Sequence, residues 1–271
     1  DMNWQKTKRL DVVSLERARV QITNILQLVS SGPRSYNSDS DVPHHDWPLW
    51  DAPSSSFLST PFGKDDGLQV AFDLEALVLS INGQNEQRQH LVLSGMSYPM
   101  AYGWMSIKLG SFGLDSAMFD DSADYRLESY LNHAAEISSE DQKVYDQLII
   151  LYKNADFMLH RLKKELDIKA TVLIDPSNAN IILITNLKSI TKLGFSIGSR
   201  SFPEPYFFME VSEEEEKMMK EKEDLEGMWN NARRQYILMS SDYLHQNPDQ
   251  ESKKVLDFFR INFKKITARR Q

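Results

Sequence analysis

The chain has 271 residues, no cysteine and a formal net charge of −8. This length suffices for one large domain or two of ordinary size, and the core needs no disulfide or metal to support it. The lack of cysteine excludes disulfides, thiol nucleophiles and thiolate metal sites, and the acidic balance argues against general binding to nucleic acid or anionic membranes. The first residues lack the apolar core of a signal peptide, and no apolar run has the length of a membrane span. We therefore expect a soluble, cytoplasmic protein.

The first half of the chain predicts a helix, a meander of strands and a second helix. The first helix starts near Ser14 and ends at Ser30–Gly32–Pro33, where glycine and proline stop a helix. The segment 32–56 is rich in serine, aspartate and proline but holds two tryptophans, so we expect a partly ordered loop with packed tryptophans. Apolar alternation then predicts short antiparallel strands at 57–62, 68–74, 77–81 and 90–93. A helix follows over 98–110, and Met100, Trp104 and Ile107 share one of its faces.

The second half of the chain contains the clearest periodic patterns of apolar residues. A weaker helical pattern covers 122–137, and a strong one covers 139–166. Two apolar strands, 168–174 and 181–185, follow, joined by the turn residues Asp175 to Asn178. Residues 187–201 are irregular, and 206–209 predict another strand. An acidic start at 213–216 predicts a long helix to about 245, and a last helix spans 250–268, so that the two form an antiparallel pair.

These elements predict an α+β fold, with antiparallel sheet meanders packed by helices and a C-terminal antiparallel helix pair. We expect an N-terminal region, 1–120, with the first helix, the sheet and the aromatic loop. The second region, 121–271, holds the long helix, a β-hairpin and the C-terminal helices. The two regions share the order helix, strands, helix, although no residue-level repeat is visible, and a single mixed domain is an equally open alternative.

One catalytic pattern is present, Gly194-Phe195-Ser196-Ile197-Gly198, which matches the G-x-S-x-G turn that exposes a serine nucleophile. Asp242 and His245 follow in the chain order that a triad of this kind requires. However, the turn needs a helix directly after the serine, and Pro203 and Pro205 prevent one. The hypothesis of a serine hydrolase using Ser196 therefore competes with a structural role for the two glycines.

His44, His45 and Asp46 bring together side chains that zinc can use as ligands. Adjacent histidines in a loop rarely reach one ion together, and the other histidines are dispersed. We therefore expect no metal site and no cofactor, and treat these three residues as a weak alternative to a polar loop.

Aromatic residues concentrate in the first half, where a meander can present a face to a ligand or peptide. Trp47 and Trp50 in the loop, with Tyr98, Tyr102 and Trp104 in the helix, are the residues that we select for ligand or partner binding, because interfaces favour such side chains. Packing in the core is the alternative for all five. The basic C-terminal end, with Lys264, Lys265, Arg269 and Arg270, could touch phosphate, but cations at a helix end also complement its dipole, so nucleic acid is disfavoured.

The sequence thus favours a non-enzymatic binding or interaction protein that uses a sheet face and the tryptophan loop. Its partner, an unidentified protein or small ligand, and its oligomeric state do not follow from the sequence. A serine hydrolase that uses Ser196 is the alternative.

Overall fold

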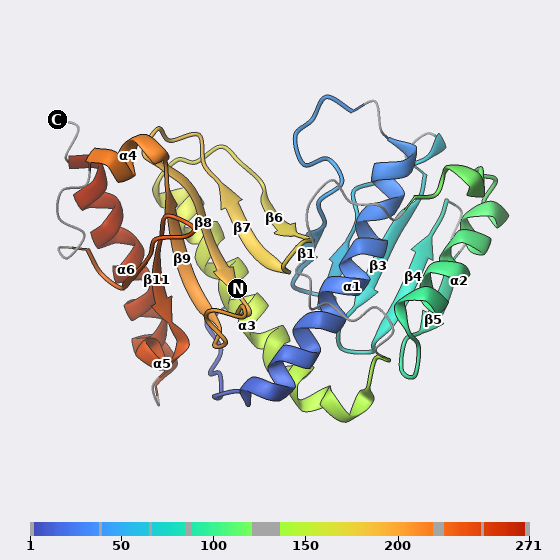
Figure 1. Cartoon of the computed structure of the whole chain (residues 1–271), viewed down its shortest axis with the longest axis horizontal. Coiled ribbons are helices and arrows are strands. Elements are labelled where there is room, and N and C mark those ends of the chain that lie inside the picture. Colours follow the sequence, from blue (N-terminus) through green and yellow to red (C-terminus); the bar gives the residue numbers. More distant parts are fainter. Residues whose placement is uncertain are drawn as a thin grey trace. The chain divides into compact units, whose positions relative to one another are not determined.

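The computed structural model describes residues 3–37, 40–64, 67–84, 88–120, 136–218, 225–244 and 247–268. These residues form helices and two antiparallel sheets, which confirms the predicted α+β class (Figure 1). They divide into two compact units. The N-terminal unit comprises 13–149 and 173–179, and the C-terminal unit comprises 1–12, 150–172 and 180–271. The expected boundary after residue 120 stays a prediction, because it adjoins 121–135, which lie outside the described residues, as does most of the helix expected over 122–137.

The N-terminal unit contains helix α1 (Val12–Tyr36), a five-stranded sheet and helix α2 (Tyr98–Ser111). The sheet is the predicted meander, because its strands follow one another in chain order: β1 (Leu49–Asp51), β2 (Ser56–Leu58), β3 (Gln69–Asp73), β4 (Val78–Asn82) and β5 (Arg88–Val92). Cross-strand neighbours such as Phe72 and Leu79 are fully buried. Two short 3₁₀ turns, η2 (Ser116–Met118) and η3 (Ser139–Asp141), complete the unit.

Helix α1 continues past the glycine and proline that were expected to end it. Pro33 lies inside the helix, and α1 ends at Tyr36. Position 32 requires glycine for a different reason, because a Cβ there would lie 2.5 Å from the ring of Phe62. The glycine therefore makes room for an aromatic side chain and does not terminate the helix.

The C-terminal unit is built on a six-stranded sheet in the order β10-β11-β9-β8-β7-β6. The strands are β6 (Val172–Asp175), β7 (Asn180–Ile184), β8 (Ile190–Ser196), β9 (Tyr206–Val211), β10 (Met228–Asn230) and β11 (Gln235–Met239). Helix α3 (Gln142–Glu165) enters this unit from the other one, and α6 (Pro248–Ala268) is the last helix. The long helix, the β6–β7 hairpin and the last helix agree with the sequence, whereas strand β8 lies in the segment expected to be irregular.

The predicted C-terminal helix pair is wrong, because the long helix expected over 213–245 does not form. Helix α4 (Glu213–Met218) is short, β10 and β11 follow, and α5 (Ser240–Tyr243) is a single turn. The reason lies in β11, whose residues Tyr236, Ile237 and Leu238 are buried on both faces of the strand while it pairs with β9. Consecutive buried apolar residues suit a covered central strand, and a helix would have exposed part of them.

Candidate functional site

The Gly194–Gly198 segment is a strand followed by a loop. Ser196 is the last residue of β8, and the chain runs through an irregular loop into β9. The side chain of Ser196 is buried, and its Oγ accepts a hydrogen bond from the backbone N–H of Gly198 at 3.2 Å. No helix follows the serine, so the helix N-terminus that would hold an oxyanion is missing from this segment.

Packing and backbone conformation explain why both positions are glycine. A Cβ on Gly194 would lie 2.4 Å from the ring of Phe208, and Gly198 has a φ of +107°. The first glycine allows close packing against an aromatic side chain, and the second takes a backbone conformation that other residues rarely adopt. Asp242 is exposed on α5, and His245 lies outside the described residues. The structure therefore does not bring a triad together in the part of the chain that it describes.

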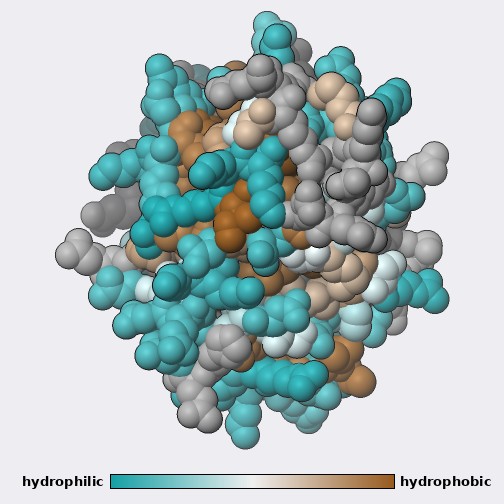
Figure 2. Space-filling view, turned by 90° about the vertical axis from the view of Figure 1, so that its left-hand side faces the viewer, coloured by the Kyte–Doolittle hydropathy of each residue, from teal (hydrophilic) through white to brown (hydrophobic). Residues whose placement is uncertain are grey.

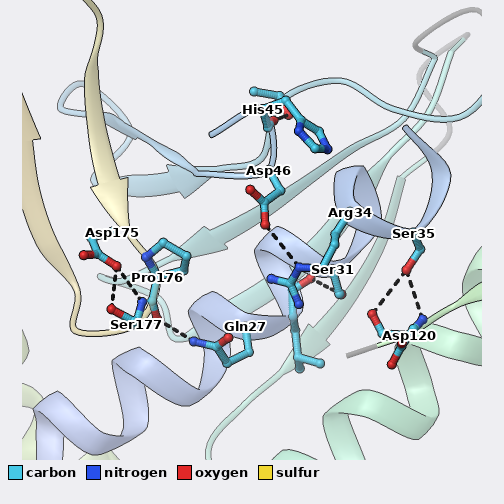
Figure 3. A network of polar contacts seen from close by, with 12 residues as sticks. Gln27, Ser31, Arg34, Ser35, His45, Asp46, Asp120, Asp175, Pro176 and Ser177 are labelled. Carbon is cyan, nitrogen blue, oxygen red and sulfur yellow. Dashed lines mark hydrogen bonds and ion pairs between the residues drawn. The ribbon is translucent and has the colours of Figure 1, made fainter. Parts of the chain in front are cut away.

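The residues His44, His45 and Asp46 lie in a turn before β1, where Asp46 binds an arginine (Figure 3). The Nε of Arg34, on α1, donates to Oδ2 of Asp46 at 3.1 Å, and both side chains are about 15 % exposed. The ring of His44 instead lies against Trp47, with centroids 4.0 Å apart. Within the described ranges, no group of three potential ligands could hold a metal ion.

Neighbouring polar contacts in Figure 3 fix further segments to α1. The side-chain amide of Gln27 donates to the carbonyl of Pro176 in the β6–β7 turn, and the Oγ of Ser35 accepts from the backbone N–H of Asp120 at 3.0 Å. Asp175 caps its own turn by accepting from the N–H of Ser177. The polar side chains of α1 thus hold the surrounding loops in place, which is a structural role.

The aromatic candidates differ in exposure. Trp50 is buried against Phe57, with ring centroids 4.9 Å apart, whereas Trp47 is only half-buried. On α2, Tyr98 is buried, and Tyr102 stacks on Phe119 at 5.1 Å. Trp104 is half-buried. Trp47 and Trp104 therefore keep the accessible surface that a contact residue needs.

The middle of the five-stranded sheet offers no open face in the described residues. The three central residues of β3 and of β4 are all buried, so both faces of these strands are covered. At the edge of the sheet, β5 alternates between exposed and half-buried residues. A partner would therefore meet the edge of this unit or its helix α2.

Helix α2 is apolar on two opposite faces. Its inner face buries Tyr98, Ala101, Met105 and Leu109. Its outer face exposes Met100 at 54 % and Ile107 at 72 %, with Trp104 between them. Lys108 is the only charged residue of the helix. The sequence grouped the outer residues correctly but could not show that this face is the uncovered one, and the signal that points to it is the near absence of polar residues around the whole helix.

The surface of the C-terminal unit is mainly polar and contains two hollows. Figure 2 views the side on which α4 and α6 lie in Figure 1, where hydrophilic side chains cover most of the face and apolar ones gather in patches between them. One hollow, of about 660 Å³, lies between Trp4, Phe157 on α3 and Leu256 on α6. Of its three cations, Arg161 and Arg260 are hydrogen-bonded to Glu165, so much of the charge of these two is neutralised.

The second hollow, of about 680 Å³, follows the end of α3. Half of its lining is basic, and the lining comprises His160, Lys163, Lys164, Asp167, Ile168, Lys169, Ala170 and Thr171. The basic residues that the sequence indicates for phosphate contact lie instead in the last helix, and of these Arg269 and Arg270 are outside the described residues. In that helix, Arg260 forms an ion pair with Glu165, and the closest nitrogen–oxygen distance is 2.8 Å.

No family model, curated protein or solved structure matches this chain. Among the described residues, no helix is both long and apolar enough to cross a membrane.

Proposed function

We propose that this chain is a non-enzymatic binding protein that docks another protein on the outer face of α2. One observation carries the proposal: α2 is apolar on two opposite faces, and the described residues cover only one of them. Exposed apolar side chains cost solvation free energy, and a group of them on one helix is typical of a contact surface. Trp104 at the centre of the face adds the side-chain type that carries much of the binding energy at interfaces.

The shape of this face suits an amphipathic helix as the partner. Met100 and Ile107 lie seven residues apart, and so do Gly103 and Gly110 on the same side of α2. A Cβ on either glycine would meet nothing within 4 Å. The side chains of a second helix can therefore pack beside each glycine. Met100 and Ile107 can in turn pack between the side chains of that helix. Because Lys108 is the only charge on α2, the partner's contacting stripe should be apolar.

Trp47 is the remaining part of the surface that the sequence selected. It lies in the loop before β1 and is half-buried, so it is tested beside α2. No observation favours the serine hydrolase, since Ser196 is buried and bonded to its own turn.

The test compares three forms of the protein in affinity capture with quantitative mass spectrometry. These are the wild type, the double variant Met100→Glu/Ile107→Glu, and the control Val42→Glu. Val42 is 64 % exposed and lies in the loop before β1, so the control places one glutamate at another exposed apolar position. Far-ultraviolet circular dichroism checks that all three fold.

We expect a partner that the wild type and Val42→Glu retain and the double variant loses. An amphipathic helix of that partner, made as a peptide, should bind the wild type and lose about thirtyfold or more in affinity with the double variant, which corresponds to hot-spot loss at an interface. Equal capture by all three forms would exclude α2 as the contact surface. A fourth form, Trp47→Ala, tests the loop, and loss of capture with this change alone would move the surface to the loop.

A further inference from the structure

The hollow after α3 is formed by the way this helix ends. Asp167 has a φ of +50°, and the backbone N–H of Ile168 donates to the carbonyl of Lys163 at 3.0 Å. This is the six-residue reversal in which a left-handed residue turns the chain back over the last helical turn. Ile168 is buried under the turn, and Lys169 is carried to the same hollow as Lys163 and Lys164. Three lysines from both sides of the turn are thereby gathered around one depression.

These lysines are not neutralised by any of the described acidic residues. Lys163, Lys164 and Lys169 form no ion pair in the part of the chain that the structure describes. Asp167 is the only acid in the lining. The hollow therefore carries a local positive excess on a protein whose formal net charge is −8. Cationic hollows on an otherwise acidic surface concentrate anions locally.

His160 adds a fourth donor when its ring is protonated, and its orientation is fixed. Its Nδ1 lies 3.1 Å from Oδ1 of Asp156 and 3.0 Å from the carbonyl oxygen of the same residue. Because Nδ1 is held by Asp156, Nε2 is the ring nitrogen that stays available to the hollow that His160 lines.

The dipole of α3 explains only part of this arrangement. Cations in a last helical turn complement the partial negative charge there, which accounts for Lys163 and Lys164. Lys169 lies beyond the helix, and His160 lies a full turn before those lysines, so neither position follows from the dipole. The same dipole opposes an anion with about half a charge, which is smaller than the excess that the three lysines provide.

We propose that this hollow binds the phosphate groups of a small polyanionic ligand. Lysine ammonium groups bind phosphate as point charges, and a set of them suits several phosphate oxygens at once. The hollow is open and large enough for more than one phosphate. Either a free polyphosphate compound or the phosphorylated headgroup of a lipid has this chemistry.

The test measures binding of inorganic tripolyphosphate to the full chain by titration calorimetry at low ionic strength, about 20 mM, where surface charges are least screened. We expect binding that weakens as salt rises. Each of Lys163→Gln and Lys169→Gln should reduce affinity about two- to fivefold, as expected for one exposed ion pair. Asp167→Asn should raise affinity, because it removes the one acid of the lining and asparagine also tolerates a positive φ. Lys254→Gln, an exposed lysine on α6 outside the hollow, is the matched control and should change nothing.

A second arm identifies the source of the phosphate. Vesicles of phosphatidylcholine, with and without a lipid that carries phosphomonoester groups, are sedimented with the protein. Binding only to the phosphorylated vesicles, displaced by tripolyphosphate, identifies a lipid headgroup, and binding of tripolyphosphate alone identifies a free ligand. The proposal is overturned if tripolyphosphate does not bind at about 1 mM, or if Lys254→Gln weakens binding as much as Lys169→Gln does.

Discussion

At the scale of single residues, packing explains the Gly194–Gly198 segment. The ring of Phe208 occupies the space where a side chain on Gly194 would lie, and the Oγ of Ser196 is used by the N–H of Gly198. Gly194→Ala should therefore lower the free energy of unfolding by about 1–3 kcal/mol, because the added methyl group overpacks a filled site. Ser196→Ala should cost only about 1 kcal/mol, the value of one hydrogen bond. Chemical denaturation of both variants measures which substitution lowers the free energy of unfolding more.

The same residues decide the hydrolase alternative. If Ser196 were a nucleophile, a fluorophosphonate probe would label the wild type and fail to label Ser196→Ala. We expect no labelling of either protein, because the hydroxyl is buried and no helix begins after it. Labelling that depends on Ser196 would contradict the structural explanation of the segment.

His160 gives the C-terminal unit a contribution to stability that depends on pH. The hydrogen bond that the ring of His160 donates to the carboxylate of Asp156 raises the pKa of His160 above its usual 6.5, against the opposing effects of partial burial and of Lys163. The folded state therefore binds the proton more tightly than the unfolded state. The contribution is fully present below the unfolded pKa and is lost as pH rises through the raised folded pKa.

Denaturation at about pH 5.5 and about pH 9 checks the sign of this effect. His160→Gln should destabilise the protein more at the lower pH than at the higher one. In an Asp156→Asn background, the same substitution should lose most of this difference, because the carboxylate that favours the protonated ring is gone. A larger effect at the higher pH would show that the imidazolium is not stabilised by Asp156.

At the scale of elements, the sequence predicted the helices and strands whose apolar residues follow a single period. Helix α3, the β6–β7 hairpin, the β1–β5 meander from β2 onward and helix α6 each have one clear apolar pattern and suitable turn residues. It failed over 213–245, where apolar residues fit a helical stripe as well as a strand, and hydrogen bonds from β9 selected the strand. Those bonds depend on a partner about thirty residues earlier, which no local period reports.

The two candidate surfaces also depend on tertiary packing, which local sequence patterns do not report. The grouping of Met100, Trp104 and Ile107 follows from helix geometry alone, but their exposure depends on which face of α2 the rest of the unit covers. The basic hollow depends on the positive φ of Asp167, and an aspartate in that conformation has no clear sequence signature beside the lysines. Local patterns therefore predict which residues lie together on one element, and tertiary packing decides which of them remain accessible.

At the scale of the whole molecule, the first residues belong to the unit that contains the last ones. The backbone of Gln5 forms two hydrogen bonds of 2.7 Å with the side-chain amide of Asn154 on α3. The indole N–H of Trp4 donates to the buried carboxylate of Glu251 on α6 at 3.1 Å. The ring of Trp4 also contacts Phe207 on β9 and Tyr243 on α5. One short segment thereby links two helices and the sheet of the C-terminal unit.

This arrangement predicts that damage at the start of the chain destabilises its end. Trp4→Ala should lower the free energy of unfolding of the C-terminal unit by about 3–5 kcal/mol, because it leaves a cavity and removes a hydrogen-bond donor to a buried carboxylate. Hydrogen exchange measured by mass spectrometry should then accelerate in peptides from β9 and α6, while peptides from β3 and β4 keep their protection. Trp47→Ala, which removes the same side chain from the N-terminal unit, should leave β9 and α6 unchanged. Equal acceleration in both sheets after Trp4→Ala would mean that the two units unfold together and that the segment stabilises the chain as a whole.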